Sequence, residues 1–523
     1  MRLKVESLKC KVGWPSGYRL PQFDLEAMKE RTEAVPAWLH IGAGNISRIY
    51  LGGIQQELLE KGLVDTGIIV WEGYDEEIIS KAFAPYDNLT LGVTLNADGS
   101  IDKRVIASMP HAFSGNPRKL HEIIAKPSLQ LISFTITEKG YTVNDTTVCN
   151  GPESATTTLE QATAGLYARF MAKSPPLALV AMDNFAENGT HLAKAIEVIA
   201  QKWHQDNHVP ADFVDYVKLQ SYPWTMIDKI TPRPSETVAE MLATDGYADT
   251  AVTVTSKNTF VASFVNAEAS QYLVIEDNFP NGRPPLEQAG VYMTDRETVR
   301  KVDQMKVCAC LNPLHSILAI AGMLLNYPTI ADCMKDDRLV RLIRQAAKEA
   351  LPMVEDPGII NPEVFLEEVL TQRFPNPFIP DTPARIASDT SQKIPVRFGT
   401  NLKARQDGGL PFDELQATPL FIAMWLRYRM SMDDKGHVLD LSPDPRCPEA
   451  VVALRGLQFG QKADMQPILS DASLFGVDLY MAGLGEKIEK IFEELSGRAG
   501  VLDLMFLTND EHACKIQGKV VNK

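Results

Sequence analysis

Apolar positions follow two different patterns along the chain, and the change falls near residue 290. Before it, short apolar runs alternate with longer amphipathic stretches. The runs at 38–41, 67–72, 129–137 and 177–182 predict strands, and the stretches at 158–173 and 191–206 predict helices. Strands that alternate with helices indicate an α/β domain around a parallel sheet. Residues 1–35 have the pattern of a polar lead-in.

A loop-like segment at 277–285 precedes the second pattern, which is mostly helical. The predicted helices lie at 296–326, 337–352, 362–373, 415–431, 448–456 and 484–496. We therefore expect an N-terminal α/β domain at 1–290 and a mostly α-helical C-terminal domain at 291–523.

Length and charge narrow the class of protein. The chain has 523 residues, 45% of them hydrophobic, so two or three domains with sizeable cores are expected. The formal net charge of −15 argues against nucleic-acid binding, which needs a basic surface. It does not argue against a small anionic substrate, because a few arginines and lysines can make one pocket positive in a protein with a negative net charge.

Cysteine usage and apolar runs indicate a cytoplasmic protein. The 7 cysteines are odd in number and far apart, so we expect no disulfide framework and a reducing compartment. The first residues contain no apolar core of a secretion signal. The longest apolar run, 316–325, is shorter than the roughly 20 residues that cross a bilayer, and predicts a buried helix. No membrane partner is expected.

A glycine turn follows the first predicted strand. Gly42 and Gly44 would let the backbone bend and approach a pyrophosphate at the start of a helix. The third glycine of the usual pattern is replaced by Ser47, so this signal is weak by itself. Glu72 ends the next strand, where an acid can bind ribose hydroxyls and repel a 2′-phosphate, which favours NAD over NADP. The alternative is that Glu72 is an acid in a surface loop.

Two later strand ends also carry polar residues. Thr135 and Thr137 end one strand at the edge where open α/β sheets bind ligands; the alternative is a strand that simply leads into the glycine turn at Gly140. The segment from Asp183 to Asn188 follows the next one, and its neutral amides could hold a hydroxyl or an alkoxide. Helix capping is the simpler explanation of that segment.

Lys306, Asn312 and His315 border the strongly apolar helix of the second half. A partly desolvated lysine has a lowered pKa and can work as an acid–base group. Asn312 could bind a carbonyl or alkoxide oxygen, and His315 would lie on the same helix face. Cys308 and Cys310 with His315 could suggest zinc, but residues two apart on a helix diverge and no second ligand pair follows, so no metal is predicted. The other alternative is that these residues have no chemical role: Lys306 would extend its ammonium group to the surface, and His315 would be a buried structural histidine.

The motifs together resemble the polyol-specific long-chain dehydrogenases, the mannitol dehydrogenase family. The resemblance runs from about Trp38 to beyond Lys393. Its segments are Gly42-Ala-Gly-Asn-Ile-Ser-Arg48, Thr137-Glu-Lys-Gly-Tyr141, Asp183-Asn-Phe-Ala-Glu-Asn-Gly189, Met226-Ile-Asp228-Lys-Ile-Thr-Pro232, Ile275-Glu-Asp-Asn-Phe-Pro-Asn-Gly-Arg-Pro284, Arg373-Phe-Pro-Asn-Pro377 and Arg385-Ile-Ala-Ser-Asp-Thr-Ser-Gln-Lys393.

The resemblance implies a Rossmann-like N-terminal domain, a mostly α-helical C-terminal domain, an active site between them and no metal. It implies that Lys306 is the catalytic acid–base. Asn312 and Asn188, with Asn184 as the alternative, would form an oxyanion hole. It implies that His315, Arg385 and Lys393 hold the substrate and that Asp228 lines the site, and Arg373 is a further candidate for binding the substrate. The implied NAD-binding residues are Gly42, Gly44, Asn45, Ile46, Glu72, Thr137 and Lys139.

The sequence departs from the family in one place. The family usually spaces its lysine and asparagine five apart, whereas Lys306 and Asn312 are six apart. Pro313 also disfavours α geometry at Asn312 and removes a backbone donor. We therefore predict a one-residue bulge or kink between Lys306 and Asn312.

The segment from Cys310 to His315 is most similar to the branch that interconverts D-mannonate and D-fructuronate with NAD(H). The pairs mannitol–fructose and altronate–tagaturonate are the alternatives. A hexuronate carries a carboxylate, so we expect Arg385 and Lys393, with Arg373 or Arg397, to supply positive charge. A different kind of alternative is a non-catalytic dinucleotide-binding protein. Such a protein should have lost at least one of Lys306, Asn312 and His315, and all three are present. The oligomeric state stays open.

Overall fold

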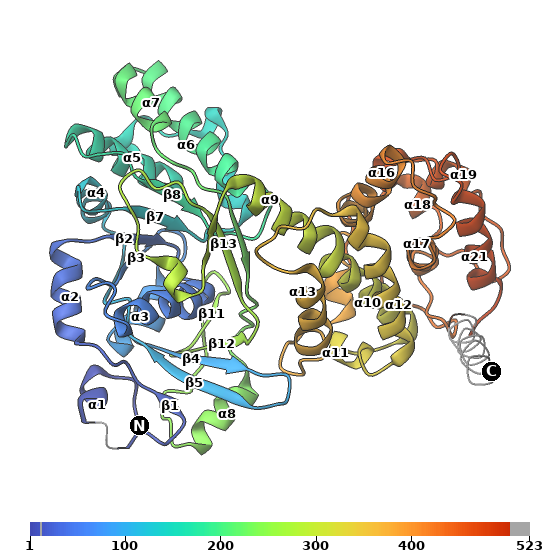
Figure 1. The fold of residues 1–523 in the computed structure, drawn as a ribbon, viewed down its shortest axis with the longest axis horizontal. Coiled ribbons are helices and arrows are strands. Elements are labelled where there is room, and N and C mark those ends of the chain that lie inside the picture. The colour runs from blue at the N-terminus through green and yellow to red at the C-terminus, as the bar shows by residue number, and fades with distance from the viewer. Residues whose placement is uncertain (11–12, 501, 503–523) are drawn as a thin grey trace. The chain divides into compact units, whose positions relative to one another are not determined.

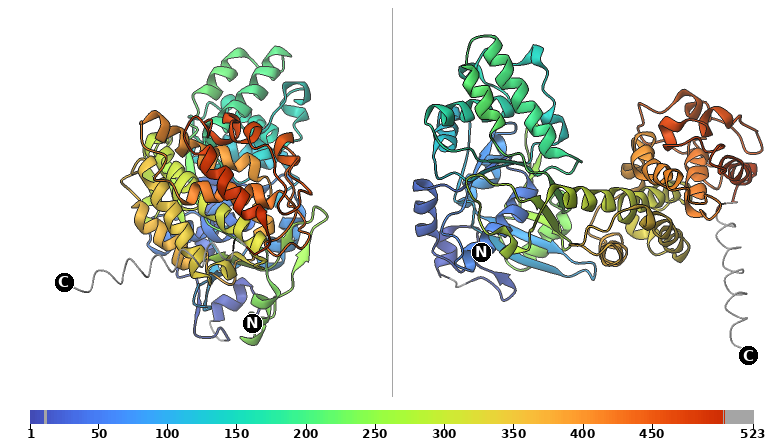
Figure 2. Two further views of the ribbon diagram at one scale, coloured as in Figure 1. Left: turned by 90° about the vertical axis from the view of Figure 1, so that its right-hand side faces the viewer. Right: turned by 45° about the horizontal axis from the view of Figure 1, so that its top comes forward.

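The computed structural model describes residues 1–10, 13–500 and 502. The chain divides into two compact units, Met1–Arg300 and Lys301–Lys523, and the expected boundary at 290/291 lies shortly before this division. Unit 1 contains every strand of the described residues and unit 2 is built from helices (Figures 1 and 2). The structure therefore confirms the expected α/β and α-helical classes.

A five-stranded parallel sheet forms the centre of unit 1. Its order is β6-β3-β2-β7-β8, and every neighbouring pair is parallel. The strand order reverses between β2 and β7, and in open α/β sheets the ligand-binding crevice lies at the carboxyl ends of the strands beside such a reversal. The strands are β2 (Trp38–Ile41), β3 (Ile68–Glu72), β6 (His111–Ser114), β7 (Leu131–Phe134) and β8 (Ala178–Ala181).

The two faces of this sheet are covered differently. Leu39 and Ile41 point to the face that α4 (Pro117–Ala125), α5 (Thr158–Met171), α6 (Asn188–Gln205) and α7 (Ala211–Lys218) cover. Trp38 and Val70 point to the other face, against the π-helix η1 (Ser47–Leu51) and α3 (Gly52–Glu60). Both faces are apolar because the strands are buried on both sides, which explains the continuous apolar runs of the sequence.

Three smaller sheets complete unit 1, and the sequence did not predict them. They have the orders β1-β5-β4-β12, β14-β13-β9 and β10-β11. Their strands are β1 (Tyr18–Arg19), β4 (Thr90–Leu95), β5 (Ile101–Ile106), β9 (Thr225–Asp228), β10 (Thr253–Val254), β11 (Phe260–Val261), β12 (Phe264–Glu268), β13 (Tyr272–Glu276) and β14 (Tyr292–Thr294).

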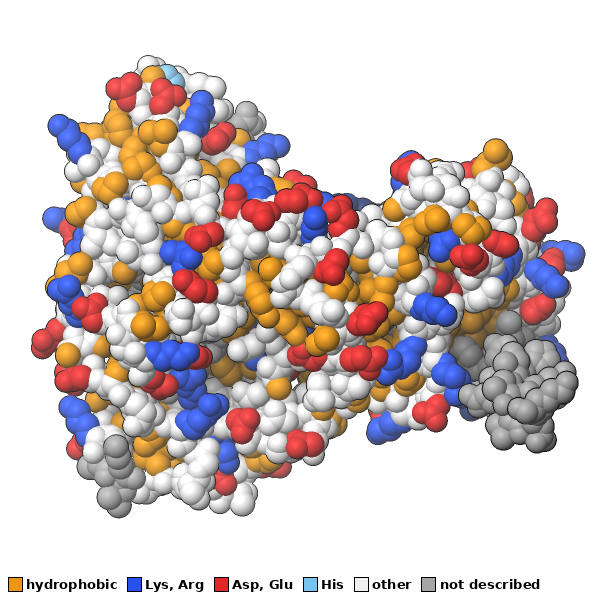
Figure 3. Space-filling view, in the orientation of Figure 1, with side chains coloured by type: hydrophobic (Ala, Val, Ile, Leu, Met, Phe, Trp, Pro, Cys, Tyr) orange, Lys and Arg blue, Asp and Glu red, His pale blue; other side chains and the backbone are white. Residues whose placement is uncertain are grey.

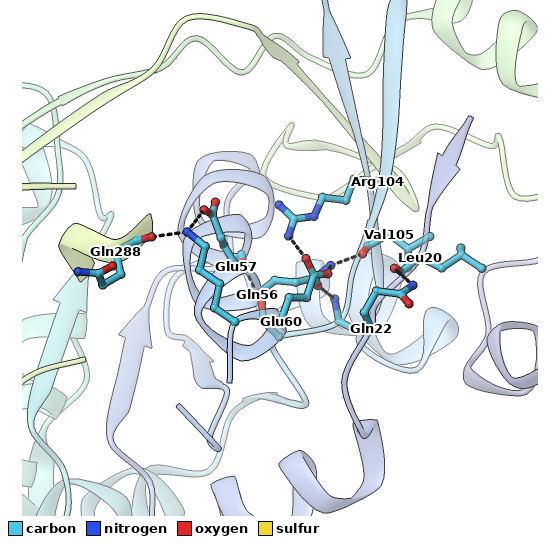
Figure 4. Close-up of polar contacts among 12 residues, drawn as sticks. Leu20, Gln22, Gln56, Glu57, Glu60, Arg104, Val105 and Gln288 are labelled. Atoms are coloured by element: carbon cyan, nitrogen blue, oxygen red, sulfur yellow. Dashed lines mark hydrogen bonds and ion pairs between the residues drawn. The ribbon is translucent and has the colours of Figure 1, made fainter. Parts of the chain in front are cut away.

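The outer surface of α3 is tied to these added parts by side-chain hydrogen bonds (Figure 4). Gln56 donates to the carbonyl oxygen of Val105, and Arg104 donates to Glu60, both at 2.8 Å. Because α3 continues the helical segment that starts with η1 after the glycine turn, these contacts hold that segment in place.

The remaining short helices of unit 1 lie at its periphery. The first 35 residues are more ordered than the lead-in pattern suggested, since α2 begins at an Asp24 cap. The helices are α1 (Val5–Cys10), α2 (Leu25–Ala34), η2 (Ile79–Phe83), η3 (Ala84–Tyr86), η4 (Glu138–Tyr141), η5 (Asp145–Thr147), η6 (Pro152–Ser154), α8 (Glu236–Thr244) and η7 (Leu286–Ala289).

In unit 2, α10 is the central helix and contacts α11, α12, α14 and α17. The helices are α9 (Arg296–Met305, which crosses the division), η8 (Lys306–Cys310), α10 (Asn312–Leu325), α11 (Ile330–Cys333), α12 (Asp337–Ala350), η9 (Leu351–Met353), α13 (Pro362–Glu368), η10 (Val369–Arg373), α14 (Pro383–Ala387), α15 (Thr390–Ile394), η11 (Pro395–Gly399), α16 (Thr400–Asp407), α17 (Ala417–Tyr428), α18 (Glu449–Val452), α19 (Gln466–Leu469), α20 (Ala472–Phe475) and α21 (Gly485–Gly497).

The helical run Arg296–Leu325 is long and apolar enough to cross a membrane by length and composition, with a mean hydropathy of 1.7 in its most apolar window. However, 78% of that window is buried in the protein, as expected of a core helix. On the face of the molecule shown in Figure 3, acidic and basic side chains are interspersed among the described residues.

Candidate active site

The glycine turn of unit 1 lies at the reversal of strand order. Gly42 follows β2 with φ +111°, and a Cβ atom there would lie 2.4 Å from the carbonyl oxygen of Thr135, just past β7. Only glycine combines that backbone angle with that close approach. Thr135 is in turn held by His40, whose Nε2 lies 3.0 Å from its hydroxyl. Burial lowers the pKa of His40 to about 3, so this histidine is neutral.

The residues after Gly42 leave the start of the next helix open. A Cβ atom on Gly44 would have no neighbour within 4 Å, so packing within the protein does not explain that glycine. Asn45 and Ile46 are partly exposed and lead into η1. A glycine with no steric reason at the head of a helix fits a turn that a pyrophosphate approaches closely.

Glu72 is a buried part of this turn. Its carboxylate accepts hydrogen bonds from the backbone N–H groups of Ala43 (2.7 Å), Tyr74 (2.8 Å) and Asp75 (3.0 Å). The side chain therefore links the glycine turn to the end of β3. The alternative of an acid in a surface loop is wrong, because Glu72 is 6% exposed. These contacts account for Glu72 without a ribose.

The segment after β7 is held in an unusual conformation. Thr137 has φ +64°, which is rare for a branched residue and costs about 1–3 kcal/mol. The Asp183 carboxylate compensates by accepting from the backbone N–H groups of Ile136 (2.9 Å) and Thr137 (3.0 Å) and from the hydroxyl of Tyr141 (2.6 Å). Burial raises the pKa of Asp183, and these hydrogen bonds oppose the rise. Lys139 stays exposed at the surface of this segment.

Asn188 and Asn184 differ in what their amides can do. The Asn188 side chain is fully buried, and its amide nitrogen already donates to Asp183 O, Thr225 O and Thr225 Oγ1 at 2.9–3.0 Å. This arrangement leaves Asn188 no amide hydrogen for a ligand and gives it a bracing role between β8 and β9. Asn184 is exposed. Asp228, at the end of β9, is 4% exposed.

In unit 2 the predicted distortion is present. Residues Lys306–Cys310 form a π-helical turn, and the N–H of Leu311 donates to the carbonyl of Lys306 at 3.2 Å. Leu311 leaves helical geometry at φ −131°, ψ −65°, and α10 begins with Asn312. The prediction of a bulge between Lys306 and Asn312 is confirmed, although the break falls at Leu311 and Asn312 itself is helical.

Lys306 is buried at this turn with 1% exposure. Asp303, one turn earlier, interacts with it electrostatically: burial raises the pKa of Asp303, and the charge of Lys306 opposes that rise. Asp303 was not among the residues predicted from the sequence, although an acid three residues before the lysine is a visible signal.

Asn312 and His315 lie on α10 beyond the break. The Asn312 amide is partly buried and makes no hydrogen bond within the described part of the chain. The His315 side chain is 14% exposed; its Nε2 atom lies 3.4 Å from Asp381 Oδ2 and has no hydrogen-bond partner. Its ring also packs on Phe374, with centroids 5.1 Å apart. His315 is therefore held by packing, with a polar atom left unsatisfied.

Four basic side chains act electrostatically on His315. Burial lowers the pKa of His315 well below its usual value, and the charges of Arg397, Arg385, Arg373 and Lys393 lower it further. The four basic residues that the sequence offered for a substrate carboxylate thus all interact with one neutral histidine. Asp381, which was not predicted from the sequence, pairs with Arg385.

No group of three or more His, Cys, Asp or Glu side chains within 1–10, 13–500 and 502 is placed to hold a metal ion. Cys308 and Cys310 are buried free thiols whose sulfur atoms contact the carbonyls of Val396 and Pro362. Burial raises the pKa of Cys308 to about 11 and that of Cys310 to about 12. Both are therefore protonated thiols of the core at neutral pH.

Comparison with known proteins gives consistent matches over both units. Residues 36–288 match the mannitol dehydrogenase Rossmann domain, and residues 298–496 match the mannitol dehydrogenase C-terminal domain. The chain is 46% identical to a D-mannonate oxidoreductase of Thermotoga maritima over 519 residues, which cover 95% of this chain and 96% of that protein.

Two solved structures have the same fold. One is D-sorbitol dehydrogenase in substrate-free form, with a TM-score of 0.79 and 22% identity, covering 96% of this chain and 100% of that one. The other is mannitol 2-dehydrogenase of Pseudomonas fluorescens in a ternary complex with NAD and D-mannitol, with a TM-score of 0.70 and 24% identity, covering 98% of this chain and 100% of that one.

Proposed function

This chain belongs to the mannitol dehydrogenase family, and we propose that it is an NAD-dependent oxidoreductase that interconverts D-mannonate and D-fructuronate. The relative from Thermotoga maritima, similar over nearly the whole chain, supports this substrate pair. The observation in the structure that carries it is the group of four cations around His315, which fits a sugar that carries a carboxylate.

The proposed cofactor is NAD. When bound, its oxidised form accepts the hydride and its reduced form donates it. Gly42, Gly44, Asn45 and Ile46 would hold its pyrophosphate, because they form an open turn at a helix start. Thr137 and Lys139 would border the same crevice from the end of β7. Glu72 would act mainly by fixing the turn through its bond to Ala43.

Lys306 is the proposed acid–base group. In reduction its ammonium donates a proton to the substrate oxygen as the ketone becomes an alcohol. In oxidation the neutral amine takes the proton of the hydroxyl, so we expect oxidation to be favoured at alkaline pH. Burial of Lys306 keeps water from competing for this proton.

Amide groups stabilise the negative charge that develops on the substrate oxygen. Asn312 suits this role because its side-chain amide makes no hydrogen bond within the described residues. For the second amide we propose Asn184 in place of Asn188, whose donors are consumed by β8 and β9. His315 is neutral and can orient a substrate hydroxyl, and Asp228 would line the site.

The direct test is to follow NADH consumption with D-fructuronate, D-tagaturonate and D-fructose in parallel. We expect kcat/KM to be highest for D-fructuronate. A preference for D-tagaturonate or D-fructose would reassign the protein to one of its near relatives. NADH consumption with none of the three sugars would refute the proposed function.

A further inference from the structure

We infer that Arg397 is the residue that binds the carboxylate of the sugar-acid substrate and so separates sugar acids from neutral sugars. This inference rests on the proposed function. Four basic side chains lie around His315, and their contacts within unit 2 distinguish them.

Three of the four cations are already engaged. Arg385 pairs with the Asp381 carboxylate. The ammonium of Lys393 donates to the backbone carbonyls of Ile386 (2.9 Å) and Ser388 (2.5 Å). Arg373 is 4% exposed and has partners of its own.

Arg397 lacks a counter-ion. Within the described residues its guanidinium forms no ion pair, and its hydrogen bonds go from Nη1 to the carbonyl of Asn312 (3.1 Å) and the hydroxyl of Ser316 (2.7 Å). Burial alone lowers the pKa of Arg397 to about 10, with no carboxylate to oppose it. Buried charges are normally paired, so a buried arginine without an anion indicates a ligand that brings one.

The free edge of Arg397 has the right shape for a carboxylate. Nη1 is used by Asn312 and Ser316, whereas Nε and Nη2 have no partner in the described part of the chain. These two nitrogens form one edge of the planar guanidinium, and two parallel N–H groups match the two oxygens of a carboxylate. A neutral sugar has no planar, charged group that accepts from both of these N–H groups at once.

The contact with Asn312 ties Arg397 to the start of α10, which carries Asn312 and His315. Nη1 binds the backbone carbonyl of Asn312, and the charge of Arg397 acts on His315. Arg397 would thus anchor one end of the substrate while Asn312 and Lys306 act on the ketone.

The test compares Arg397→Gln and Arg397→Lys with the unmodified protein on D-fructuronate and on the neutral ketose D-fructose. We expect Arg397→Gln to raise KM for D-fructuronate about 100-fold with a smaller change in kcat. Its kcat/KM for D-fructose should change less than about threefold, so the preference for the acid collapses. Arg397→Lys should recover part of the affinity, because it keeps the charge but not the two-pronged geometry.

Arg344→Gln is the matched control, since Arg344 is a half-exposed arginine of the same unit that pairs with Glu367. It should leave both substrates unaffected. Thermal unfolding and NADH affinity identify a variant that fails to fold, and Arg397→Lys then serves as the milder test. Equal losses on both sugars, or a fall in kcat with KM for D-fructuronate unchanged, would overturn the inference, because Arg397 would then only hold Asn312. Failure of the unmodified protein to reduce any sugar acid would instead refute the proposed function.

Discussion

At the scale of single residues, the surroundings of each residue show whether packing within the protein explains it or leaves room for a ligand. Gly42 and Gly44 illustrate this, because they stand two apart in one turn for different reasons. Gly42 has a positive φ and meets Thr135, whereas Gly44 has open space around it. The fold requires the first glycine. No packing contact of the described residues explains the second, which we propose to be needed where a pyrophosphate approaches the turn.

Alanine substitutions at these two glycines should therefore separate stability from binding. Gly42→Ala should destabilise unit 1 by about 1–3 kcal/mol, because of its strained backbone and the clash with Thr135. Gly44→Ala should unfold at the normal temperature but bind NADH at least tenfold more weakly. Thermal unfolding and NADH titration measure the two effects. Normal NADH affinity in Gly44→Ala would contradict the assignment of the turn to the pyrophosphate.

The pKa of Lys393 predicts a pH dependence. Burial, with the nearby charge of Arg397, lowers this pKa to about 8, so the side chain is cationic below pH 8 and neutral above it. As pH rises through 8, the positive charge around His315 falls by one, and KM for D-fructuronate should rise while KM for D-fructose stays level. Lys393→Arg should flatten that rise, because arginine keeps its charge. A KM for D-fructuronate that is constant from pH 7 to 9 would exclude a role for this charge.

The sequence predicted features that depend on neighbouring residues, and missed those that depend on residues far away in the chain. The burial of Lys306 is a feature of the first kind, because apolar residues surround it in the sequence. Asn188 is the opposite case, because nothing near it in sequence shows that Thr225 consumes its amide. Asp381 was missed for the same reason: its partner Arg385 is local, but its approach to His315 is not.

At the scale of elements, the sequence revealed strands that are apolar along their whole length. β2, β3, β7 and β8 are buried on both faces and form apolar runs. Burial alone was not enough, since β9 and β12 are also buried but contain polar residues and were not predicted. β5 has three charged residues in succession and is only partly buried, so the same reasoning did not find it. The break between α9 and α10 could be predicted because one extra residue and Pro313 are both visible in the sequence.

The π-turn Lys306–Cys310 should tolerate the loss of one residue better than a regular helix does. Deleting Ala309 lets the turn relax to α geometry while the residues on either side keep their packing. Deleting Ala319 from α10 instead rotates every later core position by about 100°, and should abolish folding. Circular dichroism and thermal unfolding compare the two. Equal damage from both deletions would mean that the π-turn is not a local insertion.

At the scale of the whole molecule, the chain combines two units with separate tasks. Unit 1 supplies an open glycine turn at the reversal of a parallel sheet, and unit 2 supplies a buried lysine and a cationic group around a neutral histidine. The net charge of −15 conceals these basic residues, so the net charge of the whole chain does not argue against an anionic sugar as the substrate.

We propose that Lys306 moves the proton in a reaction between NAD(H) and a sugar acid, and the turnover of Lys306→Ala with D-fructuronate measures this role. We predict that kcat falls about 10²–10⁴-fold. NADH affinity and the unfolding temperature should stay close to those of the unmodified protein. Near-normal turnover in Lys306→Ala would contradict the account.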